Sequence, residues 1–387
     1  MKRWVFVLSF FVAVVAFVLV QAFTPLKFGA NAQETKSVGG AEAVLLIEAN
    51  TGTILHEQNA NKKLPIASMT KMMTLKVLFN EIESGKFGED DEVLISDYAA
   101  SQEGSQAFLD SGKKYKLADL VRSTIIASAN DSAVAIAEYV AGSEQAFAEI
   151  MNKTCAQMGM TNSHFANSTG LPAVDHYSSA SDMAKLAKEV VLNPIYKKYS
   201  KIYLDELEHD SGRKTQLVNT SRSLKNYVGF EGGKTGHTGE AGYCMAAVAK
   251  RGDMCLVAVV LGETSAKQRT DDIVWLFDYG FDNFKTKEVV SSAKEIAKIE
   301  VENGMNNSIA VYAKKSFVVF MNKTDKFEYK IATEFDKLVA PVEKGQKAGT
   351  LKVLLDDNVA FETDLIAGEN SPHVGLWRTY KSIVEKF

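Results

Sequence analysis

Residues 232–263, GGKTGHTGEAGYCMAAVAKRGDMCLVAVVLGE, restrict the possible folds more than any other stretch of this chain. They predict two apolar strands joined by a turn near Arg251-Gly252, and an amphipathic helix, TDDIVWLFDYGFDNF, follows them. An earlier strand pair is predicted in AEAVLLIEANTGTILHEQNANKKL, around a turn at residues 49–52. Strands at both ends with helical patterns between them predict an α+β fold, in which an antiparallel sheet is flanked by a helical cluster.

Capping and stop signals bound the helical patterns. Ser143 is a candidate N-cap, and Asn193-Pro194 ends the last helix because proline restricts the residue before it. The expected helices cover about residues 68–83, 117–128, 131–142, 143–158 and 179–193. Past residue 287 the pattern changes to alternating apolar and polar residues, which predicts a small all-β domain over residues 287–368. A chain of 387 residues is long enough for both domains.

Both ends of the chain carry patterns typical of contact with a membrane. A basic start, an apolar run from Trp4 to Phe23 and small residues after it predict a secretory signal over residues 1–32, cleaved after Ala32. The alternative is an uncleaved anchor. Residues 371–387 predict an amphipathic helix that lies on a membrane surface, or else a short helix packed on its own β domain. We therefore expect a protein of the cell envelope, peripheral to the outer face of the cytoplasmic membrane.

Composition excludes several other classes of protein. A net charge of −4 gives no reason to expect nucleic acid as a partner. The cysteines at positions 155, 244 and 255 are too few for a disulfide framework, and we interpret them as apolar fillers. The histidines lack metal-ligand spacing, so neither a metal ion nor another cofactor is expected.

Ser68 and Lys71 stand out in the otherwise apolar segment LPIASMTKMMT. At positions i and i+3 of a helix their side chains share one face within hydrogen-bonding reach. A serine hydroxyl needs a base, and an exposed lysine remains protonated at neutral pH. Burial among methionines and a second nearby cation would each lower the lysine pKa. The segment therefore suggests a serine nucleophile with a lysine base.

Two further motifs follow in a specific order. Ser128-Ala129-Asn130 forms a polar loop, and Lys234-Thr235-Gly236 begins a predicted strand. With S-x-x-K at residues 68–71, they resemble the three-part signature of penicillin-binding proteins and serine β-lactamases. The wider runs IASMTKMMT, SANDSAVAIAE, GMTNSHFANSTGLP and GGKTGHTGEAGYCMAAV resemble the serine-type D-alanyl-D-alanine carboxypeptidases, the low-molecular-mass penicillin-binding proteins, over residues 38–285. The β domain and the tail resemble the stalk and membrane anchor of that family.

The resemblance implies a serine carboxypeptidase that removes the terminal D-alanine from peptidoglycan stem peptides, with β-lactams as covalent inhibitors. Ser68 would attack the carbonyl between the last two D-alanines and form an acyl-enzyme. Lys71 would accept its proton, and Ser128 would relay a proton to the departing amine. Asn130 would hold Lys71 and the substrate amide.

The resemblance also assigns substrate-binding roles to the Lys-Thr-Gly strand. Lys234 would provide fixed positive charge for the substrate carboxylate, which the hydroxyls of Thr235 and Thr238 would also bind. Gly236 would let the strand approach the substrate. The backbone N–H of His237 would form the oxyanion hole together with that of Ser68.

Each role has a structural alternative. Ser128 and Asn130 are common helix caps, and Lys234 could be a solvated strand end. Two other functions stay open: a serine β-lactamase and a non-catalytic cell-wall-binding protein. Glu189, in EVVLN, matches the Glu-x-x-Leu-Asn pattern of class A β-lactamases, but it falls on a predicted amphipathic helix, so we expect an exposed helix residue.

Overall fold

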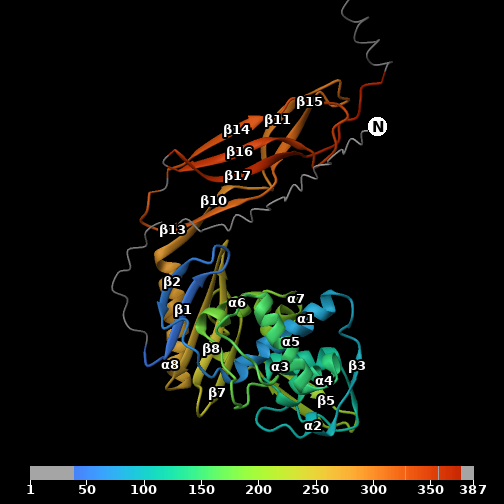
Figure 1. The fold of residues 1–387 in the computed structure, drawn as a ribbon, viewed down its shortest axis with the longest axis vertical. Coiled ribbons are helices and arrows are strands. Elements are labelled where there is room, and N and C mark those ends of the chain that lie inside the picture. Colours follow the sequence, from blue (N-terminus) through green and yellow to red (C-terminus); the bar gives the residue numbers. More distant parts are fainter. Residues whose placement is uncertain (1–38, 327, 356, 376–387) are drawn as a thin grey trace, which may run out of the picture.

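The computed structural model describes residues 39–326, 328–355 and 357–375 (Figure 1). The first part of the chain is built on a five-stranded antiparallel sheet with the strand order β2-β1-β9-β8-β7. Its strands are β1 (Ala43–Glu48), β2 (Ile54–Gln58), β7 (Phe230–Thr238), β8 (Gly242–Arg251) and β9 (Met254–Glu263). The sheet thus joins the two predicted strand pairs, and the predicted α+β fold is confirmed.

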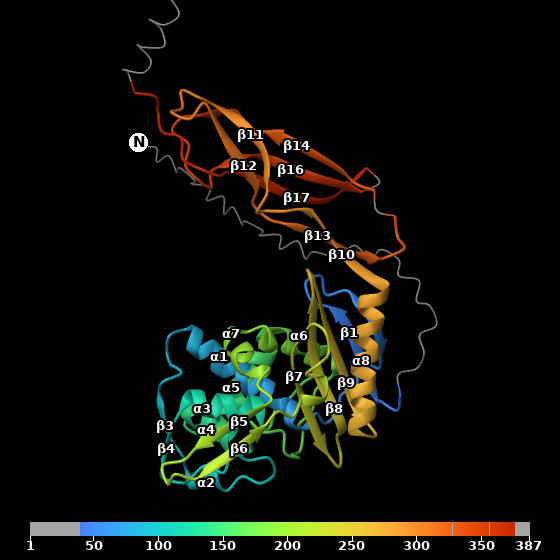
Figure 2. The same cartoon turned by 180° about the vertical axis from the view of Figure 1, so that it is seen from behind.

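Helices cover both faces of this sheet, which explains why its central strands are apolar throughout. Helix α8 (Ala266–Asn283) packs on one face, where Gly280 leaves room for Leu256 of β9 (Figure 2). Helix α6 (Ala180–Val191) packs on the other face. Residues of β8 and β9 are therefore divided between two apolar cores, one beneath α8 and one within the helical cluster.

The five helices expected from the sequence are present with boundaries close to those predicted. The helical elements before α8, besides α6, are η1 (Ala67–Thr70, a 3-10 helix), α1 (Lys71–Glu83), α2 (Asp97–Ala100), α3 (Leu117–Ile126), α4 (Asn130–Ala141), α5 (Glu144–Gln157) and α7 (Pro194–Ser200). Ser143 caps α5 by accepting a hydrogen bond from the N–H of Ala146. Helix α7 was not predicted, since Asn193-Pro194 was interpreted only as the end of the preceding helix. Asn193 also caps α7, and proline is favoured at the first position of a helix.

Two small hairpin-like sheets flank the helical cluster on the side away from the main sheet (Figure 1). One pairs β3 (Glu92–Leu94) with β4 (Lys114–Lys116), and the other pairs β5 (Leu204–Glu208) with β6 (Lys214–Val218). A long connection, residues 101–113, leads into β4. A short 3-10 helix, η2 (Arg222–Leu224), lies between β6 and β7.

The C-terminal part of the described chain is an all-β domain, as predicted, and begins directly after α8. Strands β10 and β13 form one ribbon, and a six-stranded sheet has the order β14-β16-β17-β12-β11-β15. The strands are β10 (Phe284–Val290), β11 (Glu295–Glu302), β12 (Ser308–Ala313), β13 (Phe317–Asn322), β14 (Lys330–Phe335), β15 (Leu338–Val339), β16 (Lys347–Leu355) and β17 (Asn358–Ala367).

Some expectations about the chain ends fall on residues that the structure does not describe. The signal over residues 1–32 and residues 376–387 of the expected tail helix lie outside the described ranges. Residues 371–375 are not helical, since Ser371 and His373 form isolated β-bridges. Within the described ranges, no helix has the length and hydropathy needed to cross a bilayer. The three cysteines are buried and free.

Candidate active site

Ser68 and Lys71 lie where η1 meets α1, and their side chains are in contact. Lys71 Nζ is 3.0 Å from Ser68 Oγ. Lys71 is fully buried and Ser68 is half-buried. The α-helix begins at Lys71, three residues later than predicted, and Ala67 adopts a φ of 47°, which a residue with a side chain rarely does. This tight turn places the hydroxyl of Ser68 beside the amine.

The surroundings of Lys71 disfavour its charged form. The three methionines around it are fully buried, as the sequence suggested. Burial lowers the pKa of Lys71 well below its usual value, and the positive charge of Lys234 lowers it further. The carboxylates of Asp131 and Glu144 oppose this shift but have smaller effects. These surroundings therefore favour the neutral amine, the form that can accept a proton from Ser68.

Lys234 connects the second and third motifs. It is fully buried on β7, and its Nζ donates hydrogen bonds to Ser128 Oγ at 2.7 Å and to the carbonyl of Thr235 at 2.9 Å. The alternative of a solvated strand end is wrong. Burial and the positive charge of Arg269 lower the pKa of Lys234 to about 7.

The alternative that Ser128 and Asn130 cap α4 is also wrong. The N-cap position is Ala129, and no side chain accepts a capping hydrogen bond there. Ser128 instead has a φ of 62°, which directs this turn towards Lys234. Asn130 is the first residue of α4, and its Nδ2 donates to the carbonyl of Glu103 at 2.5 Å. Its Oδ1 is buried without a partner among the described residues, so it is available to a ligand.

Strand β7 packs directly against η1 at Gly236. A Cβ added at this position would lie 2.5 Å from the carbonyl oxygen of Ile66 and 3.2 Å from the backbone N of Met69. Only glycine allows this approach, which brings the Lys-Thr-Gly strand next to Ser68. The approach of strand to helix explains why this glycine follows Lys234 and Thr235 in the motif.

The remaining substrate-binding candidates follow along β7. Thr235 is buried, and Thr238 is half-buried with its hydroxyl accepting the N–H of Ala241. His237 is exposed and its ring stacks on Tyr243 with 4.0 Å between centroids. This position suits a backbone contribution better than proton transfer, because the amine of Lys71 is the group that contacts Ser68 Oγ.

Comparison with known proteins agrees with this geometry. The family model described as D-alanyl-D-alanine carboxypeptidase matches residues 30–265, and the model described as penicillin-binding protein 5, C-terminal domain, matches residues 284–373. The chain belongs to the D-alanyl-D-alanine carboxypeptidase family. The second match begins at the first residue of β10.

Relatives of this carboxypeptidase match it over most of their length. D-alanyl-D-alanine carboxypeptidase DacF of Bacillus subtilis is 37% identical over 87% of this chain and 87% of its own length. DacA of Escherichia coli K12 is 33% identical, covering 86% of this chain and 84% of its own. The crystal structure of penicillin-binding protein 5 from Haemophilus influenzae superposes with a TM-score of 0.68 at 31% identity, covering 88% of this chain and 99% of that chain.

The loop over residues 167–171, for which no role was predicted, completes the site of the carboxypeptidase. The carbonyl oxygen of Thr169 accepts a hydrogen bond from Lys71 Nζ at 2.7 Å. Gly170 follows with a φ of 83° and packs on the carbonyl of Ala67, where any Cβ would overlap. The signal was the run Asn-Ser-Thr-Gly, which is typical of a turn, but sequence alone does not reveal that the turn reaches Lys71.

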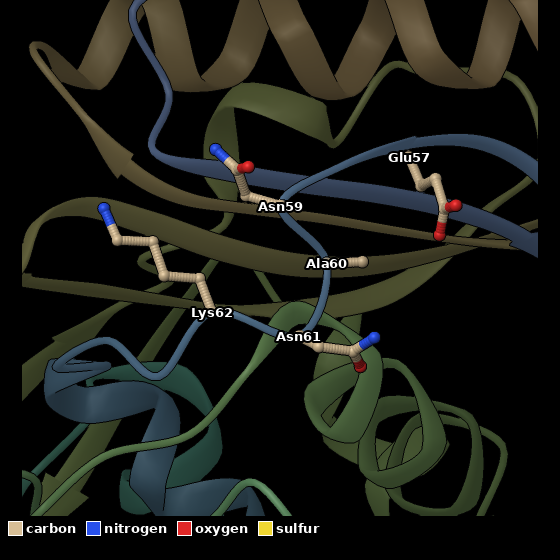
Figure 3. A pocket seen from close by; sticks show the side chains of 5 residues that line it. All are labelled: Glu57, Asn59, Ala60, Asn61 and Lys62. Atoms are coloured by element: carbon tan, nitrogen blue, oxygen red, sulfur yellow. The ribbon is translucent and has the colours of Figure 1, made fainter.

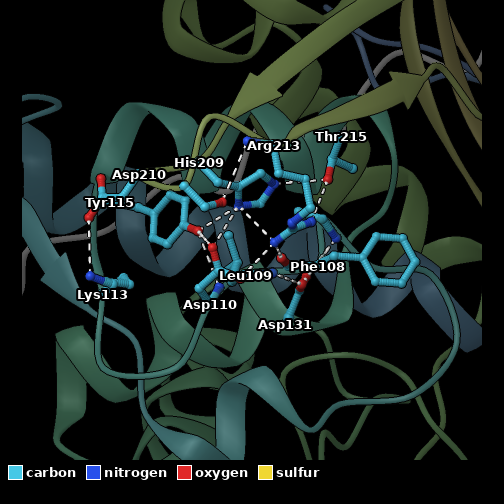
Figure 4. Close-up of polar contacts among 12 residues, drawn as sticks. Phe108, Leu109, Asp110, Lys113, Tyr115, Asp131, His209, Asp210, Arg213 and Thr215 are labelled. Carbon is cyan, nitrogen blue, oxygen red and sulfur yellow. Dashed lines mark hydrogen bonds and ion pairs between the residues drawn. The ribbon is translucent and has the colours of Figure 1, made fainter.

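A second feature absent from the sequence analysis fixes residues 101–113 beside the site (Figure 4). Arg213, at the turn between β5 and β6, donates to the carbonyl of Phe108 at 2.6 Å and to Asp110 at 2.7 Å. His209 is buried and contacts the hydroxyl of Tyr115 at 2.6 Å. Burial, and next the charge of Arg213, lower the pKa of His209. These contacts attach the β5–β6 sheet to the connection that also reaches Asn130.

Asp131 holds the same connection from the other side. Its buried carboxylate accepts the backbone N–H groups of Ala107 and Leu109. The N–H of Asn130 in turn donates to the carbonyl of Ser105 at 2.7 Å. The position of Asn130 therefore depends on tertiary contacts of residues 101–113 as well as on α4.

Glu189 forms a surface ion pair, and Arg269 acts electrostatically on Lys234. Glu189 is on α6, its side chain is 50% exposed, and it pairs with Lys76 at 3.3 Å. This confirms an exposed helix residue. Arg269 lies in the first turn of α8, is buried, and has an Nε without a partner among the described residues. Its positive charge contributes to the lowered pKa of Lys234.

An open pocket lies elsewhere, at the end of β2, and contains none of the three motifs (Figure 3). Its lining residues are Glu57, Asn59, Ala60, Asn61 and Lys62. Lys62 there is paired with Glu42 at 2.7 Å. The described ranges hold no cluster of three or more His, Cys, Asp or Glu residues suited to a metal ion.

Proposed function

We propose that Ser68 is the nucleophile with which this enzyme removes the terminal D-alanine from peptidoglycan stem peptides. The chain is a serine-type D-alanyl-D-alanine carboxypeptidase and a penicillin-binding protein. The observation that carries the assignment is the fully buried Lys71 amine, 3.0 Å from Ser68 Oγ and 2.7 Å from the carbonyl of Thr169. A buried amine in this position is a base ready to activate the hydroxyl.

Acylation begins with attack of Ser68 Oγ on the carbonyl carbon of the penultimate D-alanine. As the C–O bond forms, the hydroxyl proton moves to the neutral amine of Lys71. The developing oxyanion is stabilised by the backbone N–H groups of Ser68 and His237. The tetrahedral intermediate then loses the C–N bond, and the departing D-alanine amine takes a proton through Ser128.

Deacylation reverses these roles with water as the nucleophile. Water attacks the acyl-enzyme ester and gives a proton to the amine of Lys71. Ser68 Oγ then leaves and is reprotonated. Lys234 assists in both halves because it donates a hydrogen bond to Ser128 Oγ at 2.7 Å. The unpartnered Oδ1 of Asn130 supports a role in binding the substrate amide.

Substrate recognition rests on the terminal carboxylate of the stem peptide. Lys234, with a pKa of about 7 in the free site, would gain a proton fully when an anion binds beside it. The hydroxyls of Thr235 and Thr238 complete the carboxylate site on β7. β-Lactams carry an equivalent carboxylate and a reactive amide, so they acylate Ser68 and act as covalent inhibitors.

The proposal places the enzyme in the cell envelope, on the outer face of the cytoplasmic membrane. Support comes from the sequence of residues 1–32, which is typical of a secretory signal, and from the helical spacing of the apolar residues in 376–387. Association of the tail with a membrane surface is part of this proposal. Binding of full-length and 1–370 protein to anionic vesicles tests it.

The β-lactamase alternative is disfavoured by Glu189. Its carboxylate is exposed on α6 and paired with Lys76, so it does not activate a water at Ser68. We expect slow release of penicillin rather than rapid hydrolysis. Fast turnover of a chromogenic cephalosporin that Glu189→Gln reduces would favour the β-lactamase instead.

Mass spectrometry of a pentapeptide ending in D-Ala-D-Ala tests the activity directly. The expected product lacks one alanine, and Ser68→Ala abolishes its formation. A matched control is Ser84→Ala at the end of α1, where the hydroxyl only bonds the carbonyl of Glu81 at the surface. A fluorescent penicillin should label the wild type and the control but not Ser68→Ala. Equal labelling of all three would refute the assignment of Ser68.

A further inference from the structure

Asn167 makes its hydrogen bonds to residues 169–171, and its side chain organises the turn that reaches Lys71 and Ala67. Its Oδ1 accepts three hydrogen bonds, from the N–H of Gly170 at 2.7 Å and from the N–H and hydroxyl of Thr169, both at 3.2 Å. Its Nδ2 donates to the carbonyl of Leu171 at 2.9 Å. One side chain therefore fixes the backbone on both sides of Thr169.

The carbonyl held in this way touches the base. Thr169 O lies 2.7 Å from Lys71 Nζ, closer than Ser68 Oγ at 3.0 Å. A neutral amine has two N–H groups and one lone pair. When one N–H is directed to the carbonyl of Thr169, the lone pair can face Ser68 and accept its proton. Without the carbonyl, rotation about the Cε–Nζ bond would leave the lone pair undirected.

The same turn also touches the residue before the nucleophile. Gly170 packs on the carbonyl of Ala67, and a Cβ there would also lie 2.8 Å from Thr70 Oγ1. A shift of the turn would therefore act on the base and on the strained turn at Ala67 together. Residues 167–171 thus support both reacting groups at once.

We propose that Asn167 is a positioning residue, which directs the lone pair of Lys71 towards Ser68 by fixing the carbonyl of Thr169. The inference rests on the proposed roles of Ser68 and Lys71. The Oδ1 of Asn167 accepts from three donors of the turn, and its Nδ2 donates to the carbonyl of Leu171. Alanine has neither group, and aspartate keeps the acceptor but loses the donor.

The start of this loop is anchored independently, so loss of Asn167 should leave the fold intact. Ser168 donates its N–H and hydroxyl to Glu144 at 2.9 and 2.6 Å, and its carbonyl accepts the hydroxyl of Thr74 at 2.6 Å. The effect of Asn167→Ala should therefore be confined to residues 169–171.

The test compares three variants by stopped-flow acylation with a fluorescent penicillin over a range of pH. For Asn167→Ala, the limiting acylation rate constant should fall on the order of 10- to 100-fold, because misplaced reacting groups lose near-attack geometry. The dissociation constant of the complex before acylation should change little. Asn152→Ala is the matched control, since this asparagine makes two hydrogen bonds to the backbone of Phe165 in the same segment.

Asn167→Asp separates positioning from a general structural effect. Its carboxylate still accepts from Thr169 and Gly170, so the rate at high pH should recover towards that of the wild type. Its negative charge favours the ammonium form of Lys71, so the acid limb of the pH–rate profile should move to higher pH. If Asn167→Ala does not fold, as judged by its melting curve, Asn167→Asp carries the test through this shift.

Two results would overturn the proposal. One is an acylation rate for Asn167→Ala equal to that of Asn152→Ala. The other is an Asn167→Asp variant with neither recovered rate nor a shifted acid limb. Absence of any covalent adduct in the wild type would instead contradict the role of Ser68, so the two failures are distinguishable.

Discussion

Replacing Gly236 by alanine tests whether the contact between β7 and η1 sets the geometry of the site. The added Cβ would lie 2.5 Å from the carbonyl oxygen of Ile66, with the Cβ of Ala67 and the backbone N of Met69 both at 3.2 Å. None of these atoms is the end of a flexible side chain. The strand must therefore move away from η1, and the Lys-Thr-Gly motif moves away from Ser68 with it.

The size of the effect follows from these distances. Restoring an ordinary contact of about 3.4 Å to the carbonyl of Ile66 requires a displacement of roughly 1 Å, and misplacement of this size costs about 10²-fold in rate. Overpacking in a closely packed region costs about 1–3 kcal/mol of stability. The acylation rate should thus fall while the protein remains folded.

The assay is the rate of labelling by a fluorescent penicillin, together with a thermal unfolding curve. Gly239→Ala is the matched control, because this glycine follows β7 and an added Cβ there meets no atom within 4 Å. We expect Gly239→Ala to label like the wild type. If Gly236→Ala labels as fast as Gly239→Ala, the close approach of β7 to η1 does not determine the reactivity of Ser68.

Three other perturbations give sharp expectations. Burial lowers the pKa of His176 from 6.5 to about 4. The contribution of this histidine to the free energy of unfolding should therefore be complete above pH 6.5 and fall by about 3 kcal/mol as the pH falls towards 4. His176→Gln should flatten this pH dependence in denaturant titrations. Lys234→Gln removes a charge that lowers the pKa of Lys71, so the acid limb of acylation should move to higher pH; an unmoved limb would contradict the coupling. Glu189→Gln should leave penicillin release unchanged and alter stability by less than about 1 kcal/mol, because the Glu189 side of its pair with Lys76 is half-exposed to solvent. A slower release would support the β-lactamase alternative.

Much of the site was predictable because its chemistry lies in short local motifs. The spacing of Ser68 and Lys71 and the methionines around them predicted a serine–lysine pair in an apolar setting. In the structure the two side chains are in contact, Lys71 is fully buried and Ser68 is half-buried. The turn at Ser128 and the strand at Lys234 were expected to belong to the same site, but their direct hydrogen bond was not. Their contact spans 106 residues, and local patterns carry no information on such pairings.

The end of α6 and the start of α7 show that local patterns also limit what can be predicted of the fold. The stop at Asn193-Pro194 was predicted correctly, but the sequence did not show that Asn193 also begins α7. The long connection over residues 101–113 has no periodic pattern, so its role was invisible. It is ordered by Arg213 and Asp131, which come from distant parts of the chain.

The sequence by itself determined the two strand pairs of the main sheet, the longer helices, the order of the three motifs and the apolar setting of Lys71, because each depends on residues close together in the chain. Tertiary structure alone decided which backbone groups meet that amine. Thr169 reaches Lys71 across 98 residues, and the pKa of Lys234, which is on β7, is lowered to about 7 by burial and by Arg269 on α8. Electrostatic and hydrogen-bonding effects depend on distance in space, which folding sets and which spacing along the chain does not reveal.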